Sequence, residues 1–338
     1  MTQPSAARIA GLGIYLPQTR QTAAEIAAAS GVPEAVVRGK MGLERKTVPG
    51  ADDHSNAMGI DAARGALADA GVDPLAVDLL ISITEEHKEY PVWTAGIHAA
   101  QQLGATRAWA FDVGQKCGSA ILALKLAQDM LRGDAALSTV LIAGGYRNCD
   151  LIDYRDASVR FLYNLAAGGG AAVVTRSGPG FELLGSAFVT DGTFSEDVII
   201  PVGGTKAPLT AENLDQFRFR IPDPPGMKQR LEQRSLDNFI AVAREACARS
   251  GVDSAAVAYC AMLHMKRSAH EAVLARLDIA PERSIYLSDY GHVGQIDPLL
   301  SLKLARDAGR LRDGDVCLLL AAGIGYVWNA MCVRYRTT

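Results

Sequence analysis

One helical pattern occurs twice in this chain, and the two copies are 178 residues apart. Leu122 to Asp129 reads LALKLAQD, and Leu300 to Asp307 reads LSLKLARD. Two further pairs of segments repeat in the same order, namely 62–77 with 242–257 and 140–145 with 318–323. Repetition on this scale indicates a duplicated supersecondary unit. The sequence therefore predicts two related halves with room for a site between them.

The chain alternates short apolar runs with longer amphipathic stretches, which is typical of parallel strands joined by crossover helices. We expect one half over residues 1–190 and the other over 235–338. Residues 191–234 are rich in turn formers and charges and are predicted to form a linker or lid. Strands are predicted at 8–15, 79–84, 108–113, 139–143, 170–175, 180–189, 258–263, 285–287, 316–321 and 330–335.

Composition argues against several other classes of protein. The 34 Lys and Arg nearly balance the 37 Asp and Glu, so the chain has no strong field for nucleic acid or an anionic membrane. The six cysteines lack CxxC spacing, so neither a zinc site nor a disulfide framework is predicted. Without an apolar leader or a membrane-length apolar run, we expect a cytoplasmic protein.

Cys117 lies in FDVGQKCGSAILALKLA, just after a predicted strand and at the first turn of an apolar helix. The free N–H groups and the dipole of a helix N-terminus stabilise a thiolate. Small neighbours, Gly114, Gly118 and Ser119, leave space for another molecule to approach the sulfur. A buried, inert thiol is the usual role of a cysteine, but this setting favours a nucleophile.

Two histidines fall at matching strand ends in the second copy. His264 ends the strand in AYCAMLHMKRSAH, and His292 lies in the turn SDYGHVGQID, close to the counterpart of Cys117. Because duplicated halves face each other across a pseudo-two-fold axis, we expect Cys117, His264 and His292 to meet in one pocket. The other four histidines are interpreted as ordinary core or surface groups.

Two further features suggest supporting roles. Gly325, in AAGIGYVW after a buried strand, lets a backbone N–H face the pocket and hold an oxyanion, although tight packing alone also explains the glycines. The charged run 85–89 is most simply a solvated loop. The alternative is that one of its carboxylates, such as Glu89, acts as a general base or lines the acyl tunnel.

Taken together, these segments resemble the thiolase superfamily, most closely its β-ketoacyl-acyl carrier protein synthase III branch. The resemblance spans nearly the whole chain, from GLGIYLP and GLERK through FDVGQKCGSA, LHMKRSAH and YGHVGQ to AAGIGYVW. It implies a five-layered αβαβα fold of two duplicated halves and a homodimer formed through the first-half sheet. No cofactor or metal is implied, since coenzyme A or an acyl carrier protein would serve as part of the substrate.

The resemblance also implies roles for individual residues. Cys117 matches the acyl-accepting nucleophile, His264 a catalytic histidine and Gly325 an oxyanion donor alongside the Cys117 N–H. His292 stands where this branch normally has asparagine, which is the main departure. Further departures are Met265 in place of glutamine, no aspartate in NLAAGGG, and no tryptophan in 21–40 to stack an adenine. Arg45, Arg160 and Lys40 are candidate contacts for a carrier phosphate, or else ordinary surface cations.

The sequence thus predicts a cytoplasmic acyltransferase of ketosynthase III type. Cys117 takes an acyl group from coenzyme A or a carrier protein, and decarboxylative condensation with a malonyl thioester is slightly favoured as the second step. The first alternative is O- or N-acyl transfer to a small molecule, because imidazole accepts a proton and asparagine does not. The second is a non-catalytic partner subunit.

Overall fold

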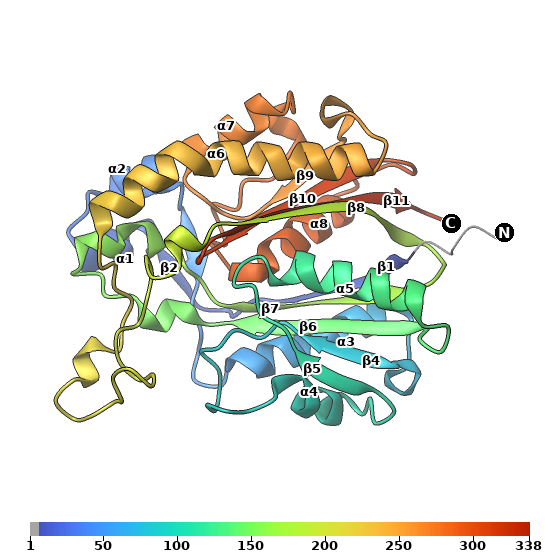
Figure 1. The fold of residues 1–338 in the computed structure, drawn as a ribbon, viewed down its shortest axis with the longest axis horizontal. Coiled ribbons are helices and arrows are strands. Elements are labelled where there is room, and N and C mark those ends of the chain that lie inside the picture. Colours follow the sequence, from blue (N-terminus) through green and yellow to red (C-terminus); the bar gives the residue numbers. More distant parts are fainter. Residues whose placement is uncertain (1–6) are drawn as a thin grey trace.

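Nine strands form one mixed sheet in the part of the chain that the computed structural model describes, residues 7–338 (Figure 1). The strand order is β5-β4-β6-β7-β1-β8-β11-β10-β9. The two central strands, β1 and β8, are paired only through Arg8–Ile9 and Phe181–Glu182, so the sheet divides there into two halves. The strands are β1 (Arg8–Tyr15), β4 (Leu79–Ser82), β5 (Trp109–Asp112), β6 (Thr139–Tyr146), β7 (Gly168–Thr175), β8 (Gly180–Thr190), β9 (Tyr259–Met262), β10 (Val316–Gly323) and β11 (Val327–Arg336).

Helices cover both outer faces of the sheet and fill the space between its halves. The cores of the described residues separate in the same way: α3 and α4 pack on β4, β6 and β7, α5 and α8 lie in the central core, and α6 and α7 pack on β9, β10 and β11. Figure 1 shows the resulting five layers, αβαβα. The helices are α3 (Ser55–Ala70), α4 (Ala95–Leu103), α5 (Ser119–Gly133), α6 (Pro224–Arg249), α7 (Arg267–Arg276) and α8 (Asp297–Asp307).

The repeated segments occupy equivalent places in the two halves. The LALKLAQD and LSLKLARD copies form α5 and α8 in the central layer, and the strands that follow them are β6 and β10. A smaller insertion in the first half contains α1 (Ala23–Ser30), α2 (Glu34–Val36) and the hairpin of β2 (Arg20–Thr22) with β3 (Arg45–Thr47). The predicted duplication and five-layered fold are confirmed.

Three sequence predictions differ from the structure. The sheet is mixed rather than parallel, because β7 and β11 run antiparallel to their neighbours. Residues 285–287 are not a strand: the Ser284 hydroxyl donates to Cys260 O and the Tyr259 hydroxyl accepts from Ile285 N–H, so side chains replace the backbone ladder beside β9. The predicted linker 191–234 overlaps α6, which begins at Pro224, a residue compatible with a first helical turn.

No helix within residues 7–338 combines the length and the apolar character needed to cross a membrane.

Candidate active site

Cys117 lies in the tight turn between β5 and α5, with its side chain almost buried at 9% exposure. The preceding residue, Lys116, has a φ of 51°, in the left-handed region that non-glycine residues seldom occupy. The Ser119 hydroxyl accepts from Gln115 N–H at 2.7 Å and donates to Lys116 O at 2.7 Å. These two hydrogen bonds close the turn and fix the thiol at the start of a helix, the position that favours a thiolate.

The second half of the chain holds this turn from the other side. The amide of Asn329, on β11, donates to Gly118 O and to Gln115 Oε1, each at 2.9 Å. At Gly323, the end of β10, a β-carbon would lie 3.0 Å from Cys117 N and 2.7 Å from Gln115 O. Only glycine allows this approach. Asn329 was not predicted from the sequence.

His292 lies directly beside the nucleophile. Its Nε2 is 3.2 Å from Cys117 Sγ, and its Nδ1 is 2.6 Å from Asp297 Oδ2. Asp297 is fully buried at the start of α8. Cysteine, imidazole and carboxylate thus form a continuous relay in which the base is oriented by a third group.

The relay determines the charge of His292. Burial on its own would lower the pKa of this imidazole, but the adjacent Cys117 sulfur and the Asp297 carboxylate outweigh that effect and raise the pKa well above its usual value. The sulfur and the carboxylate on either side of His292 therefore stabilise its imidazolium form. This arrangement poises the sulfur for nucleophilic attack.

Asp297 was missed by the sequence analysis, although the repeat contained a signal for it. At the 178-residue spacing, Asp297 corresponds to Ser119 and Val293 to Gln115. Asp297 Oδ1 accepts from Val293 N–H at 2.8 Å, just as Ser119 Oγ accepts from Gln115 N–H. The same hydrogen bond closes the turn before the helix in both halves, but the carboxylate has a second oxygen, which binds His292.

His264 is tied to the relay by its backbone rather than by its ring. Its N–H donates to Asp297 Oδ2 at 2.7 Å. The Asn164 amide contacts ring Nδ1 at 3.0 Å, which leaves Nε2 as the protonated nitrogen, 3.3 Å from Gly42 O. Within residues 7–338 the ring makes no hydrogen bond to Cys117, so the structure joins two of the three expected groups directly and the third through Asp297.

A second set of residues missed by the sequence analysis holds Asn164. The fully buried Lys46 ammonium donates to Tyr163 O at 2.9 Å and to Leu165 O at 2.6 Å, on either side of Asn164. Asn164 O accepts from His292 N–H at 2.8 Å. One asparagine therefore positions both histidines.

Two buried histidines make the stability of the folded protein depend on pH. Burial is the main cause that lowers the pKa of His264 and of His270 from 6.5 to about 4. Because each folded-state pKa lies below the unfolded value, the unfolded chain binds more protons between pH 6.5 and 4, and stability falls as the pH drops through that window.

For His270, which lies on α7 outside the relay, we expect a loss of about 2–3 kcal/mol between pH 7.5 and 4.5. His270→Leu is expected to reduce the loss seen in urea unfolding at those two pH values. His54→Gln, at an exposed position, is the control. An unchanged pH dependence in His270→Leu would contradict the prediction.

Gly325 lies in the β10–β11 turn with a φ of 131°, a conformation that favours glycine. Neither its N–H nor that of Cys117 donates a hydrogen bond to another group within residues 7–338. The neighbouring Tyr326 is close enough to Cys117 for the sulfur to contribute, after burial, to the raised pKa of its phenol. The oxyanion role of Gly325 stays a prediction.

The charged run after β4 divides into two environments. The Glu89 carboxylate accepts from Asn56 N–H, at 2.9 and 3.2 Å, and from Ala57 N–H at 3.2 Å, so it caps the first turn of α3. That contact accounts for Glu89 structurally, and its role as a base or tunnel residue stays a prediction. Glu85, by contrast, is only 6% exposed.

The basic residues proposed as carrier contacts are all exposed. Arg45 pairs with Asp289 at 2.9 Å, while Arg160 lies in a 3-10 turn and Lys40 at the end of a short π-helical turn. The structure leaves their contact role as a prediction.

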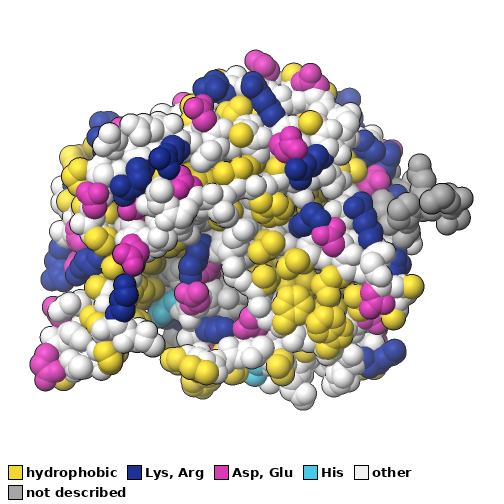
Figure 2. Space-filling model, viewed as in Figure 1, with side chains coloured by type: hydrophobic (Ala, Val, Ile, Leu, Met, Phe, Trp, Pro, Cys, Tyr) yellow, Lys and Arg dark blue, Asp and Glu magenta, His cyan; other side chains and the backbone are white. Residues whose placement is uncertain are grey.

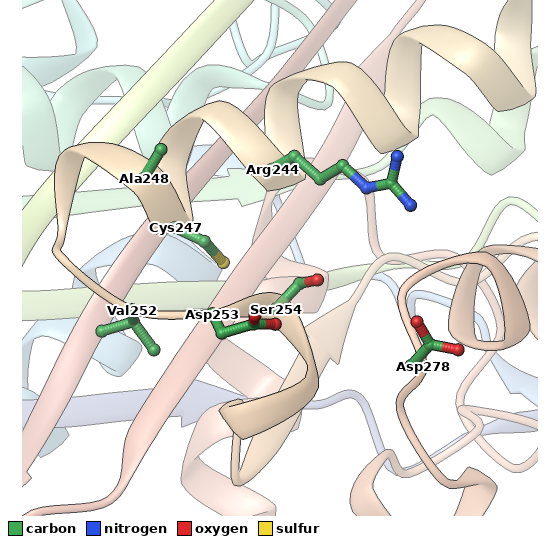
Figure 3. Close-up of a pocket in the computed structure, with 7 residues that line it drawn as sticks. All are labelled: Arg244, Cys247, Ala248, Val252, Asp253, Ser254 and Asp278. Carbon is green, nitrogen blue, oxygen red and sulfur yellow. The ribbon is translucent and has the colours of Figure 1, made fainter.

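The segment predicted as a lid contains a loop with two short 3-10 turns, at 192–194 and 214–216, before α6 begins. A hollow of about 390 Å³ lies at the other end of α6, in the outer layer of the second half. Figure 3 shows Arg244, Cys247 and Asp253 at its wall. None of its lining residues belongs to the relay.

Family models match both parts of the chain that build this site. The model for 3-oxoacyl-[acyl-carrier-protein (ACP)] synthase III matches residues 111–192, which include Cys117. The model for the C-terminal part of the same enzyme matches residues 247–335, which include both histidines and Asp297. The fold and the cysteine–histidine site define an acyltransferase of the thiolase superfamily.

Full-length relatives agree with the models. The β-ketoacyl-[acyl-carrier-protein] synthase III of Roseiflexus castenholzii is 27% identical, covering 97% of this chain and 98% of the relative. That of Aquifex aeolicus is 25% identical, covering 97% and 99%. This chain belongs to the β-ketoacyl-acyl carrier protein synthase III family. The predicted family is confirmed.

Solved structures share the fold at lower identity. The Aquifex aeolicus synthase III superposes with a TM-score of 0.84 at 23% identity, covering 97% of this chain and all of that one. The priming β-ketosynthase of the R1128 polyketide pathway gives 0.85 at 21%, covering 99% and 98%. A variant of Xanthomonas campestris OleA, solved with bound lauric acid and lauroyl-CoA, gives 0.81 at 18%, covering 98% and 100%.

Proposed function

We propose that the protein loads an acyl group from a coenzyme A or carrier-protein thioester onto Cys117 and condenses it with a malonyl thioester. The observation that carries this proposal is the relay in which His292 contacts the Cys117 sulfur at 3.2 Å and Asp297 at 2.6 Å. The names of the full-length relatives, which are synthases acting on acyl-carrier-protein substrates, support the class of donor.

In the first step the Cys117 thiolate reacts, its proton already lying on His292, whose imidazolium is stabilised by Asp297. The thiolate attacks the thioester carbonyl, and the N–H groups of Cys117 and Gly325 hold the oxyanion. As the carbonyl re-forms, the bond to the carrier sulfur breaks and the departing thiolate takes the proton from His292. The product is acyl-Cys117 and a free carrier thiol.

In the second step a malonyl thioester loses carbon dioxide, and its enolate carbon attacks acyl-Cys117. The new carbon–carbon bond forms as the bond to Cys117 Sγ breaks. His292 first takes a proton from water to replace the one given to the carrier thiol. It and the protonated Nε2 of His264 are then the donors for the enolate oxygen, once His264 Nε2 exchanges Gly42 O for substrate. The low pKa of His264, about 4, keeps this ring neutral at physiological pH.

A second function is O- or N-acyl transfer, and one observation favours it. His292 is held by a carboxylate, so after acylation it is oriented as a general base for a hydroxyl or amine. An asparagine, usual at this position, lacks that capacity. In this reaction no carbon dioxide is released.

The proposed assembly is a homodimer joined along β5. This strand is at the edge of the sheet, so its outer N–H and C=O groups are unpaired within the described chain. Trp109 is half exposed and stacks on Phe111. Figure 2 shows a broad apolar area on this face, over α5 and β5. A second copy pairing β5 with β5 would cover both the unpaired strand edge and the apolar area.

Arg45 and Arg160 remain the proposed contacts for a carrier phosphate.

The test is to incubate the protein with acyl-CoA and acyl-carrier thioesters and to weigh it intact. A mass gain equal to the acyl group is expected, whereas a non-catalytic partner subunit would gain none. Malonyl thioester is then added. Release of carbon dioxide supports condensation. Loss of the acyl group to an added amine or alcohol without carbon dioxide favours simple transfer, and no acylation by any donor would refute both.

A further inference from the structure

The backbone of His292 is held by a short segment from the other half of the chain. The His292 N–H donates to Asn164 O at 2.8 Å, and the His292 carbonyl accepts from the Ala166 N–H at 2.9 Å. Leu165, between these two residues, forms an isolated parallel bridge with His292. Both backbone groups of the base therefore depend on where residues 163–167 lie.

Lys46 fastens that segment to β3 through its side chain. The Lys46 ammonium donates to Tyr163 O at 2.9 Å and to Leu165 O at 2.6 Å. Leu165 O belongs to the same peptide group as the Ala166 N–H, so a cation on this oxygen polarises the N–H that binds His292. The lysine thus acts on the position of the segment and on the strength of its hydrogen bond to the base.

The contacts around Lys46 leave little room for movement. The hydroxyl of the neighbouring Thr47 donates to Ala167 O at 2.5 Å, and the Ala167 N–H donates to Thr47 O at 3.0 Å. At Gly291, a β-carbon would lie 2.7 Å from Lys46 Cβ and 2.8 Å from Asn164 O. Because this glycine immediately precedes the base, a shift of β3 would be passed directly to the base.

Packing alone does not explain a lysine at this position. The side chain is fully buried, and within residues 7–338 its ammonium has two carbonyls and the Tyr154 ring, 5.4 Å away, as partners but no carboxylate. Burial is the main cause that lowers the pKa of Lys46 to about 8, so the ammonium persists at pH 7. A buried cation without an acid partner costs free energy that an apolar side chain avoids. The lysine is therefore better explained by what it positions.

We propose that Lys46 is a positioning residue that keeps the His292 imidazole against the Cys117 sulfur. Its ammonium fixes the segment that holds the backbone of His292, and the ring then stays 3.2 Å from the sulfur. The hairpin of β2 with β3 thus becomes part of the active site although it supplies no reacting atom. This inference rests on the proposed role of Cys117 as the nucleophile, and it adds no reactant to the proposed reaction.

The test measures how fast iodoacetamide alkylates Cys117 at pH 7, by peptide mass after timed quenching. Iodoacetamide reacts with the thiolate, so the rate reports the contact between Cys117 and His292 without any acyl donor. Lys46→Met, which removes the donor and the charge, is expected to slow the reaction about tenfold. Lys46→Arg, which keeps a cation with several N–H donors, is expected to restore most of the rate. The deficit of Lys46→Met should shrink at pH 9.5, where a thiol ionises without help from an imidazolium.

The control is Arg20→Met, which removes a cation from the partner strand of the same hairpin and should keep the wild-type rate. Cys260 and Cys317 are fully buried, so their failure to react shows that a variant is folded. A Lys46→Met protein in which these two thiols do react is replaced by Lys46→Gln and judged by the same measurement.

The outcomes separate this inference from the proposed function. If folded Lys46→Met reacts at the wild-type rate, or if Lys46→Arg is slowed as much as Lys46→Met, the inference is wrong while the proposed function stands. Acylation of the same variants by an acyl-CoA should follow their alkylation rates. Absence of acylation of the wild-type protein by every thioester would instead refute the proposed function, and the alkylation rates would still decide the role of Lys46.

Discussion

Replacement of Cys117 by alanine is expected to abolish the acyl-enzyme, with no mass gain from any thioester that modifies the wild-type protein. The chain has six free cysteines, but the other five lack the contact with an imidazole–carboxylate pair that Cys117 makes. Removal of a nucleophile commonly costs several orders of magnitude in rate, here at least about 10³-fold. Intact-protein mass after a timed incubation measures the effect.

Cys149→Ala is the matched control, since Cys149 is the most exposed of the other five cysteines. Burial is the main cause that raises the pKa of this thiol to about 11, so it is expected to be unreactive. The control should acquire the same mass as the wild type. Acylation that persists in Cys117→Ala and disappears in Cys149→Ala would reassign the nucleophile.

Asp297→Asn is expected to slow acylation by about 10²- to 10⁴-fold while leaving the protein folded. Asp297 accepts from the ring of His292 and from the N–H groups of His264 and Val293. Asparagine has one acceptor oxygen, so it keeps the hydrogen bond from Val293 N–H only by presenting its amide group to the imidazole. The ring then loses its orientation and the charge that stabilises its protonated form.

The pH profile separates this effect from a general loss of structure. Asp297 is one of the two groups that raise the pKa of His292 against burial, so its loss lowers that pKa. The imidazolium is then lost at a lower pH, and the alkaline limit of the acylation rate should move down. Asp307→Asn, at the exposed far end of the same helix, should leave rate and profile unchanged. An unshifted profile in Asp297→Asn would contradict the relay.

The duplication explains which parts of the fold and of the site could be predicted from the sequence. Two copies at matched spacing identify the halves, and they place a histidine of one half against the helix-start cysteine of the other. His292 and Cys117 satisfy that prediction because both depend on backbone positions, which the repeat conserves. His264 satisfies it only in part, because the orientation of its ring depends on Asn164 and Gly42, which come from unrelated segments.

Other features depend on side-chain burial, which the sequence pattern does not encode. Glu85 and Glu89 look alike in one charged run, yet one lies inside a pocket and the other caps α3. In the sequence Asp297 is an ordinary acid at the start of a helix. Only the structure shows that its second oxygen binds His292. Residues 285–287 have the apolar character of a strand, but hydroxyl groups take the hydrogen bonds a strand would need.

The sulfur and its base come from opposite copies of the ancestral unit, and each lies in a turn that a side-chain hydrogen bond closes within its own half. The distance between Cys117 Sγ and His292 Nε2 therefore depends on how the two copies pack against each other. A change in the central layer that slides α5 against α8 by about an ångström would leave each half intact and still uncouple proton transfer. Substitutions between these two helices, remote from every reacting atom, should accordingly impair turnover before they impair folding.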